Sequence, residues 1–542
     1  RFGGRSNAET FSVAELAGAD WAAQTVAELS AMPNVRLMPR TTVIGAFDHG
    51  SYGAVERITD HLATSPTGKP RQILWRIYAK QAVLCAGATE RPIAFENNDR
   101  PGIMLAASMR AYANRWATTP AQRVAIFTNN DDGHRTAQDL HAKGVKIAAV
   151  IDTRPDAPSS MDYEVLQGAQ VADTKGRLGL TFVEVVRADG TTRTIECGAL
   201  GVAGGWNPNV QLTCHQRGRP IWKEGLAAFV PGGTLPSGMS VAGAAVGTFT
   251  THGALKSGAD AVRKALGLKG RAPAVPEAED APVNQTPFWY VTGCSRAWLD
   301  QQNDVTVKDV KLSHQEGFRS VEHLKRYTTL GMATDQGKTS NMGGLAIMAE
   351  LAGKSIPEVG TTIFRPPYTP TAIGTLAGRM RGKEFHPTRL TPSHFWAKER
   401  GAVFVEVGNW LRAQWFPLPG ETHWRQSVDR EVLATRSSVG VCDCTTLGKI
   451  DVQGTDAAIF LNKVYCNGFA KLAVGKTRYG LMLREDGIAL DDGTAARLAE
   501  DQFVVTTTTA NAARVYQHME FVRQCLMPQA DVQLISTTEA WA

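Results

Sequence analysis

Four carboxylates stand close together near the end of the chain, in the segment "REDGIALDDGTAAR". Glu485, Asp486, Asp491 and Asp492 flank a glycine turn between two strand-like runs. A carboxylate beside a reacting amine can take up its proton and stabilise a developing cation. Because adjacent strand residues point to opposite faces, only one of Asp491 and Asp492 can enter a pocket, and the sequence leaves open which one. A solvated turn is the simpler alternative.

A run of four threonines follows in "VVTTTTANAARV", residues 504–515. Its hydroxyl and backbone N–H groups would offer donors and acceptors to the edge of a flat heterocycle. The preference of threonine for strands explains the same run without a ligand. Tyr479, in "RYGLML", is equally compatible with contact to such a ring and with a place in the core.

A loop of small residues, "GMATDQGKTSN" at 331–341, precedes the helix-like run "MGGLAIMAELAG". The first N–H groups of a helix are unpaired and bind phosphate well. We expect Lys338, Thr339, Ser340 and Asn341 to contact a flavin phosphate or ring edge. The loop contains no cysteine or histidine and a single acid, Asp335.

Eight cysteines are scattered along the chain, and none forms a C-x-x-C pair. Cys442 and Cys444 form a C-x-C, which lacks the second pair that a zinc site needs. We therefore predict no metal site, buried core thiols at these positions, and a reducing, cytoplasmic location.

The totals limit the class of protein. A length of 542 residues suggests about three to four domains. A net charge of +6 without a Lys/Arg stripe argues against nucleic-acid binding, and the sequence has no apolar run of the ~18–20 residues that span a bilayer. The chain starts without Met and stops within a strand-to-helix passage, so we expect a fragment lacking both N-terminal and C-terminal parts.

Alternating strands and helices indicate a doubly wound α/β sheet in the first half. "QRVAIFTNNDDGHRTAQDLHAKGVKIAAVIDTR" is a complete β-α-β unit, with its helix expected at about Thr136 to Lys143. Its turn keeps only Gly133 of a dinucleotide fingerprint, and Asp131 and Asp132 would repel a phosphate. This unit is therefore predicted to be architectural.

Changes of composition suggest the domain boundaries. A Pro/Ala/Glu-rich segment and the extended stretch "FRPPYTPTAIG" are typical of linkers. We expect a multidomain chain of α/β plus α+β class, divided as a dinucleotide-binding domain at 1–270, a linker at 271–287, a small helical module at 288–353, an extended connector at 354–382 and an α+β domain at 383–542.

Two segments carry a family resemblance. "CAGATERPIAFENNDRPGIMLAASMRAY" (85–112) resembles the segment after the dinucleotide-binding strand in large flavoprotein amine oxidase subunits. "VGVCDCTTLGKIDVQGTDAAIFLNKVYCN" with "RYGLMLREDGIALDDGTAARL" resembles the folate-binding domain of the glycine-cleavage T-protein (aminomethyltransferase) family. In this order they resemble the alpha subunits of heterotetrameric sarcosine oxidase, in which a disulfide-reductase-like domain precedes the T-protein-like domain.

The resemblance implies an oxidoreductase acting on a CH–NH group with oxygen as acceptor. Sarcosine would be demethylated to glycine, with hydrogen peroxide and either formaldehyde or 5,10-methylenetetrahydrofolate as products. It also implies NAD in this chain, FMN shared with the beta subunit, FAD in the beta subunit, tetrahydrofolate, and gamma and delta partner subunits. The alternatives are a dimethylglycine- or opine-oxidising relative, a stand-alone folate-dependent aminomethyltransferase, and a scaffold with degenerate cofactor sites.

The resemblance further implies cofactor contacts. The expected first βαβ unit, with its glycine fingerprint, is missing, which should weaken NAD binding. The resemblance places Gly3, Gly4 and Arg5 along the adenosine half of NAD. It places Val43 on the adenine. It places Ala244, Phe249 and Thr251 near the pyrophosphate and ribose.

In the T-protein family the aspartate pair after the turn holds the key acid, which places it at Asp491 or Asp492 and places Thr508 and Thr509 against the pterin. Tyr479 would complete this folate contact.

In related amine dehydrogenase subunits the loop at 331–341 matches an iron–sulfur motif, "GMGxCQGxxC". Here Asp335 and Ser340 or Asn341 stand in place of thiolates, and the early cysteine pair is reduced to Cys294. One cysteine cannot hold a cluster that needs four thiolates. We therefore predict that this module carries no iron and that its loop faces FMN at the partner boundary.

Overall fold

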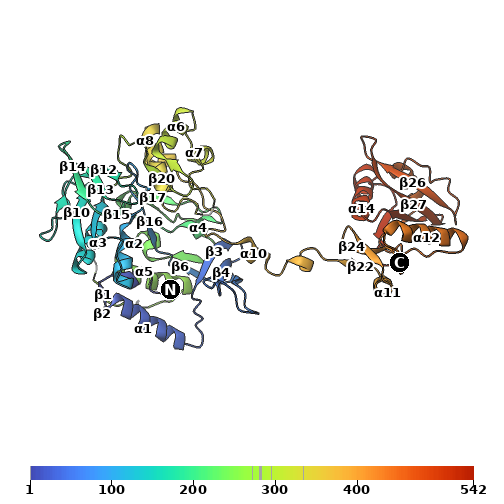
Figure 1. The fold of residues 1–542 in the computed structure, drawn as a ribbon, viewed down its shortest axis with the longest axis horizontal. Coiled ribbons are helices and arrows are strands. Elements are labelled where there is room, and N and C mark those ends of the chain that lie inside the picture. Colours follow the sequence, from blue (N-terminus) through green and yellow to red (C-terminus); the bar gives the residue numbers. More distant parts are fainter. Residues whose placement is uncertain (1, 271–272, 280–283, 295, 334, 542) are drawn as a thin grey trace. The chain divides into compact units, whose positions relative to one another are not determined.

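The computed structural model describes residues 2–270, 273–279, 284–294, 296–333 and 335–541. The chain divides into two compact units, Arg1–Gly378 and Arg379–Ala542 (Figure 1). Within the expected linker at 271–287, residues 271–272 and 280–283 lie outside the described residues.

The first unit is built on a five-stranded, all-parallel sheet in the order β11-β10-β9-β15-β8. Parallel sheets are covered on both faces and are therefore apolar throughout; accordingly, every residue of β15 is buried. The strands are β8 (Ile103–Leu105), β9 (Arg123–Thr128), β10 (Lys146–Asp152), β11 (Val165–Leu166) and β15 (Ala199–Ala203).

Alternate residues of β9 face two different layers. Val124 and Ile126 pack with helices α2 (Ala106–Trp116) and α3 (Asp131–Ala142). Ala125 and Phe127 pack against an antiparallel sheet. That sheet consists of β12 (Gln170–Lys175), β13 (Phe182–Val186) and β14 (Thr192–Glu196). The expected layered α/β architecture is thus confirmed.

A second group of strands in this unit carries the segments expected to contact NAD. An antiparallel meander, β3-β4-β5, stands beside the short parallel pair β6–β19. These elements are β3 (Thr41–Phe47), β4 (Ser51–Arg57), β5 (Gln72–Tyr78), β6 (Ala82–Leu84), β19 (Met239–Val241), the 3-10 helices η1 (Gly4–Ala8) and η3 (Gly243–Val246), and helices α1 (Gly18–Ala31) and α5 (Thr251–Leu266).

The remaining short elements connect these parts. They are β1 (Ser12–Val13), β2 (Leu16–Ala17), β7 (Ala88–Glu90), β16 (Trp206–Pro208), α4 (Gln211–Cys214), β17 (Ile221–Lys223), η2 (Glu224–Leu226) and β18 (Ala228–Val230).

A small helical module closes the first unit. Its core joins Leu324, Leu330, Leu345 and Ile347, and Thr306 forms a capping box with Asp309 at the start of α6. Its elements are β20 (Trp298–Asp300), β21 (Val305–Thr306), α6 (Val307–Gln315), α7 (Val321–Thr328), α8 (Asn341–Ala352) and α9 (Ile356–Val359), followed by α10 (Ile373–Ala377).

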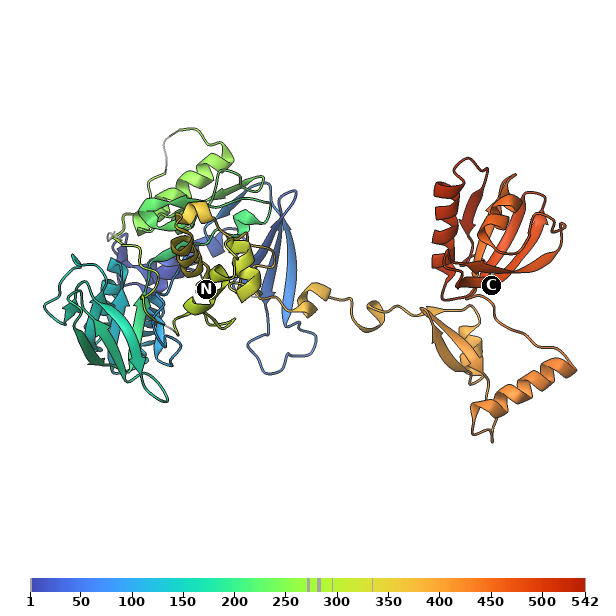
Figure 2. The same ribbon diagram turned by 90° about the horizontal axis from the view of Figure 1, so that it is seen from above.

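The second unit contains a five-stranded antiparallel sheet in the order β26-β27-β28-β25-β29. Helices α13 (Ala457–Val464) and α14 (Ala512–Phe521) supply Phe460 and Met519 to the core on one face, and Figure 2 shows α14 along the sheet. The strands are β25 (Gly448–Gln453), β26 (Thr477–Leu483), β27 (Ala489–Ala499), β28 (Gln502–Thr507) and β29 (Gln533–Ser536).

A second, three-stranded sheet in the order β22-β24-β23 precedes it. The elements are η4 (Gly382–Glu384), β22 (Arg389–Leu390), α11 (His394–Glu399), β23 (Val403–Val407), β24 (Trp410–Trp415) and α12 (Trp424–Ser437), and η5 (Val522–Leu526) continues α14. Across the residues described in both units, no helix combines the length and apolarity that crossing a membrane requires.

One predicted boundary is wrong. The helix expected from Thr136 begins at Asp131 instead, directly after β9 and the cap residue Asn130, whose side chain accepts from the N–H of Asp132 at 3.0 Å. Asx capping explains this early start. The polar segment that looked like a turn is therefore the first turn of α3.

Candidate functional site

Asp491 is a buried carboxylate, 7% exposed, on β27. It accepts hydrogen bonds from Thr508 N at 3.0 Å, Thr508 Oγ1 at 2.6 Å and Asn511 Nδ2 at 3.1 Å. Asn511 precedes the first residue of α14, so the carboxylate also lies at a helix N-terminus, where negative charge is stabilised. Asp491 thus fastens β27 to the start of α14.

Asp492 lies on the other face of the same strand. Strand neighbours alternate between faces and cross-strand partners share one; Met482 pairs with Asp491, whereas Leu481 pairs with Asp492. Met482 is in the core and Leu481 is exposed. Asp492 is half-buried, and within the described ranges its side chain makes no hydrogen bond or ion pair.

Tyr479 shares the open face with Asp492. It pairs with Thr494 across β26 and β27, two positions along from the pair that contains Asp492. The residue is 59% exposed, so the alternative of a core tyrosine is wrong. Thr494 in turn bonds Thr506 of β28, with 2.9 Å between their hydroxyl oxygens. We call this surface (Tyr479, Asp492, Thr494 and Thr506) the open face.

The predicted threonines are placed differently from one another. Thr508 gives both its N–H and its hydroxyl to Asp491. Thr509 bonds Thr446, with 3.0 Å between the two hydroxyl oxygens. Of the remaining acids, Asp486 pairs with Arg484 at 2.6 Å and Glu485 is exposed in the same turn. The structure therefore separates the four carboxylates into one anchor, one free group on the open face, and two in the turn.

Lys449 joins the segment 442–446 to the open face, and the sequence pattern gave no signal for it. It pairs with Thr506 across β25 and β28. Its buried ammonium donates to the carbonyls of Cys444 at 3.0 Å, Thr445 at 2.9 Å and Trp541 at 3.0 Å. Burial lowers the pKa of Lys449. This buried cation, bonded to three carbonyls, holds these backbone segments in place.

Asp443 is fixed within that segment. Its carboxylate accepts from Thr445 N at 2.9 Å and from the hydroxyl of Ser393. Burial alone would raise the pKa of Asp443, but the bonds from Ser393 and Thr445 lower it to about 2. The flanking Cys442 and Cys444 are exposed, so the prediction of core thiols is wrong there. It is also wrong for Cys85, Cys466 and Cys525.

In the first unit, Arg5 is committed to internal ion pairs. It bonds Glu9 and Asp132, and its guanidinium lies 4.6 Å from the Trp206 ring centroid. Arg110 reaches the same two carboxylates, at 3.0 Å and 3.2 Å. Burial alone would raise the pKa of Asp132, but Arg110, Arg5 and a third arginine lower it to about 2. Carboxylates thus occupy the N-terminus of α3, which agrees with an architectural βαβ unit.

Glu90 is buried beside this network. Its Oε2 accepts from Ala107 N at 2.8 Å, at the start of α2, while its Oε1 has no partner among the described residues. Burial, and then the charge of Asp132, raise the pKa of Glu90 to about 8. Glu90 is therefore largely a neutral acid at pH 7.

The other residues expected at NAD lie in three places. Gly3 has φ +96°, and a Cβ there would stand 2.3 Å from Asn7 Nδ2, so only glycine fits. Val43 lines an apolar cavity of about 270 Å³ with Tyr52, Leu84 and Met239. Ala244 is in η3, Thr251 is the first residue of α5, and Phe249 lies in the loop before it.

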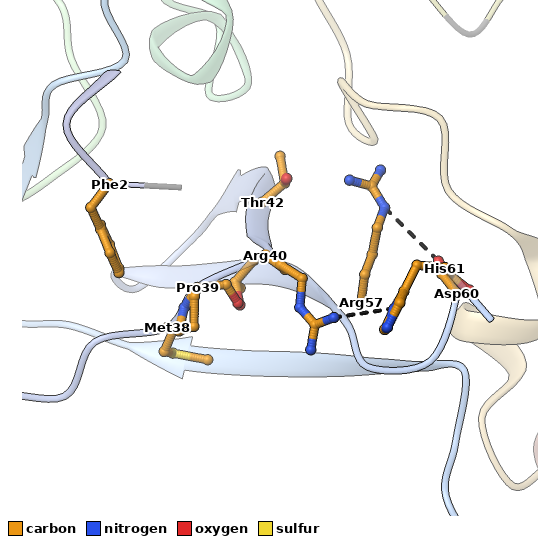
Figure 3. Close-up of a pocket in the computed structure, with 9 residues that line it drawn as sticks. Phe2, Met38, Pro39, Arg40, Thr42, Arg57, Asp60 and His61 are labelled. Atoms are coloured by element: carbon orange, nitrogen blue, oxygen red, sulfur yellow. Dashed lines mark hydrogen bonds and ion pairs between the residues drawn. The ribbon is translucent and has the colours of Figure 1, made fainter. Parts of the chain in front are cut away.

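A cavity that the motifs did not predict adjoins two of these places (Figure 3). It has a volume of about 520 Å³ and extends from Phe2 to Thr42, the neighbours of Gly3 and Val43. Arg40 Nη1 lies 3.2 Å from His61 Nδ1, and Arg57 lies 3.9 Å from Asp60 on the facing wall. Its lining comes from three separate stretches, at Phe2, 38–42 and 57–61, which is why no motif marked it.

The loop at 331–341 is folded around Asn341; Thr334 lies outside the described residues. A Cβ at Gly331 or Gly337 would stand 2.2 Å or 2.0 Å from Asn341 Oδ1. Asn341 Nδ2 donates to Gln336 O at 2.9 Å. Lys338 places its ammonium 4.4 Å from the Tyr368 ring centroid, and burial lowers its pKa. The Asn341 side chain thus lies inside the loop, against Gly331 and Gly337, and holds its backbone through Gln336 O.

Ser340 is also turned inward, toward Asp300. Asp300 is 3% exposed and accepts from Gly331 N at 2.8 Å, from Ser340 Oγ at 3.3 Å and from the N–H groups of two neighbours. Cys294, expected as the remnant of an early ligand pair, instead packs between two apolar clusters, with its Sγ 3.6 Å from Ala172 O. Within the described ranges, no three His, Cys, Asp or Glu side chains converge as metal ligands would.

Family models match two parts of the chain. The model of the sarcosine oxidase A3 domain matches residues 294–379, which include the loop, Asp300 and Tyr368. The model of the GCVT N-terminal domain matches residues 393–542, which include the open face.

Relatives match the whole chain. Sarcosine oxidase subunit alpha of Rhizobium meliloti (strain 1021) is 48% identical over 550 residues, covering 100% of this chain and 55% of the relative. The corresponding subunit of Corynebacterium sp. (strain P-1) is 42% identical, covering 97% and 57%. The chain thus spans little more than half the length of these relatives.

Among solved structures, L-proline dehydrogenase from P. horikoshii aligns with a TM-score of 0.52 at 20% identity, over 69% of this chain and 72% of that chain, which is a likeness of fold alone. The chain is thus similar over its whole length to sarcosine oxidase alpha subunits, and its residues 294–379 match the A3 domain of that family.

Proposed function

We propose that this chain acts as the alpha subunit of a multimeric sarcosine oxidase. The complex would demethylate sarcosine to glycine and form hydrogen peroxide, together with formaldehyde or 5,10-methylenetetrahydrofolate. The observation that carries the proposal is the 48% identity over the whole chain to a sarcosine oxidase alpha subunit. Eight unpaired cysteines suit a reducing, cytoplasmic location.

The domain division given above remains part of this proposal, as does the division of labour. This chain would bind NAD, line an FMN at the boundary with the beta subunit, and hold the folate. The beta subunit would carry FAD, and gamma and delta subunits would complete the complex. Oxidation of the amine is then mostly the partner's chemistry, and the capture of the one-carbon unit belongs to this chain.

The open face is proposed as the folate site, with Asp492 as its functional acid. Folate supplies the amine nitrogen that captures the one-carbon unit, and capture releases a proton. Asp492 is half-buried on the open face. Its carboxylate would take that proton or accept a hydrogen bond from a pterin N–H. Asp491 has its oxygens occupied by Thr508 and Asn511. Tyr479 would contact the ring from the neighbouring strand.

The residues present fit the adenosine end of NAD. The apolar cavity at Val43 suits a base, and the arginines of the adjoining cavity in Figure 3 suit a negatively charged group beside it. Arg5 would position Gly3 and Gly4 and not contact the dinucleotide itself, because its donors serve Glu9 and Asp132.

For FMN, two of the four expected contacts fit. Lys338 and Thr339 are half-buried, and an ammonium suits a phosphate. Ser340 and Asn341 would serve only through the loop's shape and the N–H groups at the start of α8.

Copurification tests the proposal. The full-length protein, expressed with its partner genes, should purify as a yellow complex that forms peroxide when sarcosine is added. A larger turnover with dimethylglycine or an opine would favour an oxidase relative. The GCVT domain match supports a second candidate, a stand-alone aminomethyltransferase; a colourless lone chain active on an aminomethyl donor would establish it and refute the oxidase.

A further inference from the structure

Cys442 and Cys444 form a neighbouring pair of thiols on the surface of the second unit. Both are exposed and unpaired. Cys444 Sγ turns back toward its neighbour and lies 3.7 Å from Cys442 O. Asp443, between them, reaches the other way, to Ser393. The carboxylate of Asp443 is thus directed to Ser393, while the Cys444 sulfur is directed back to Cys442.

We propose that Cys442 and Cys444 are a dithiol that hydrogen peroxide oxidises to a disulfide. Disulfides join Cα atoms about 4.4–6.8 Å apart, and two residues separated by one other span at most about 7 Å. A local bend of the 442–444 backbone can therefore bring the two sulfurs to bonding distance. The inference rests on the proposed function for the source of peroxide, which the complex itself would produce.

The reaction balances with one peroxide. The first sulfur attacks a peroxide oxygen, the O–O bond breaks, and a sulfenic acid forms; the departing hydroxide takes the thiol proton and leaves as water. The second sulfur attacks the sulfenic sulfur, the S–S bond forms and the S–O bond breaks, again releasing water. Two thiols are oxidised by two electrons, and one hydrogen peroxide is reduced to two waters.

The bond would act on the open face through two direct links. Cys444 O is held by the Lys449 ammonium, and Lys449 is the cross-strand partner of Thr506. Two residues further, Thr446 bonds Thr509. Bending the 442–444 stretch shifts the carbonyl that Lys449 binds. Oxidation therefore weakens folate binding at the open face and couples folate use to accumulated peroxide.

The chain supplies internal controls. Cys85, Cys466 and Cys525 are also exposed, each as a single cysteine in its own segment. Peroxide can add oxygen to these thiols but has no adjacent thiol with which to complete a disulfide. Exposure alone therefore predicts equal oxidation at all five positions, whereas the proposal predicts a distinct product at one pair.

Peptide mass spectrometry tests the inference on the intact complex. The sample is titrated with hydrogen peroxide, quenched with catalase, alkylated with N-ethylmaleimide and digested. The peptide containing both cysteines should lose both alkylation sites together, become two hydrogens lighter, and recover after dithiothreitol. With Cys442→Ser, the same peptide should instead gain oxygen at Cys444. A peptide that stays doubly alkylated while Cys466 is oxidised overturns the proposal.

Folate binding to the same samples tests the consequence. Tetrahydrofolate affinity should fall after oxidation in the native complex and stay unchanged in a complex with both Cys442→Ser and Cys444→Ser. Disulfide formation without any change in affinity would refute the link to the open face. Because peroxide is added from outside, a complex that makes none would refute the proposed function while leaving the disulfide test intact.

Discussion

Asp491 and Asp492 are consecutive residues whose side chains lie on opposite faces of one sheet and make opposite use of their charge. Asp491 is buried under three donated hydrogen bonds at the start of α14, and Asp492 is free on the open face. One residue therefore serves the fold, and the other is available for chemistry.

The two aspartates should separate stability from folate coupling. Asp491→Asn places an amide among Thr508 and Asn511 donors, so we expect a loss of about 1–3 kcal/mol in the free energy of unfolding. Asp492→Asn should change stability by less than about 0.5 kcal/mol and reduce methylenetetrahydrofolate formation while peroxide formation continues. Denaturant unfolding and product analysis of both variants check this; the reverse pattern would show that the roles are exchanged.

Glu90 predicts an unusual pH dependence. Its folded pKa, about 8, lies above its ordinary value of 4.5, so its contribution to stability is complete below pH 4.5 and disappears as the pH rises to about 8. Glu90→Gln removes this loss and should stabilise the first unit by about 3 kcal/mol at pH 7.

Hydrogen exchange in β7 and α2 at pH 5 and pH 8 measures the effect. Protection should fall with pH in the native protein and stay level in Glu90→Gln. The exposed Glu28→Gln is the control and should leave the native profile unchanged. Equal slopes in the native protein and Glu90→Gln would mean that Glu90 does not titrate in this range.

Gly205 tests the packing around a buried arginine. It has φ +101°, and an added Cβ would stand 2.5 Å from Gln285 Oε1 and 2.7 Å from Arg91 Nη2. Gly205→Ala should therefore cost about 1–3 kcal/mol in the free energy of unfolding, from strain and displaced side chains. Gly233→Ala, where nothing lies within 4 Å, is the matched control. Thermal unfolding that is equally affected by both would contradict the packing argument.

Lys338 tests the proposed FMN contact. Removing its ammonium by Lys338→Ala should lower the FMN content of the purified complex, because a charge-assisted bond to phosphate is lost. Lys354→Ala, an exposed lysine at the end of α8, should have no such effect. Flavin absorbance per complex, with FAD counted separately after extraction, gives the result. Full FMN in both variants would remove Lys338 from the site.

Local patterning predicted the scaffold but not its charges. The alternation of apolar segments indicated the layered α/β unit, since burial on two faces leaves a clear signal in β9 and β15. The start of α3 was missed because Asp132 is balanced by Arg5, 127 positions away in the chain, and by Arg110. Without those distant partners, two aspartates after a strand resemble an exposed turn.

The candidate site was predicted in part for a related reason. Strand alternation showed that Asp491 and Asp492 must separate, but only the position of α14 identifies the buried one. Ser340 and Asn341 looked like ligand contacts, because polarity in a loop does not indicate direction. The partner of Ser340, Asp300, is 40 residues away in the chain, and the partner of Asn341 is the backbone of Gln336 within the loop itself. Exposed Cys442 and Cys444 were missed because thiols usually pack in cores.

Gln336 has one further consequence. Its amide accepts from Arg365 N at 2.9 Å and donates to Arg365 O at 2.7 Å and to Pro367 O at 3.1 Å, so a side chain binds the connector as a neighbouring strand would. Gln336 O also holds Asn341, the residue around which the loop folds. Gln336 therefore links the backbone at 365–367 to the loop proposed to contact flavin, so that a displacement of either segment changes the hydrogen bonds of the other.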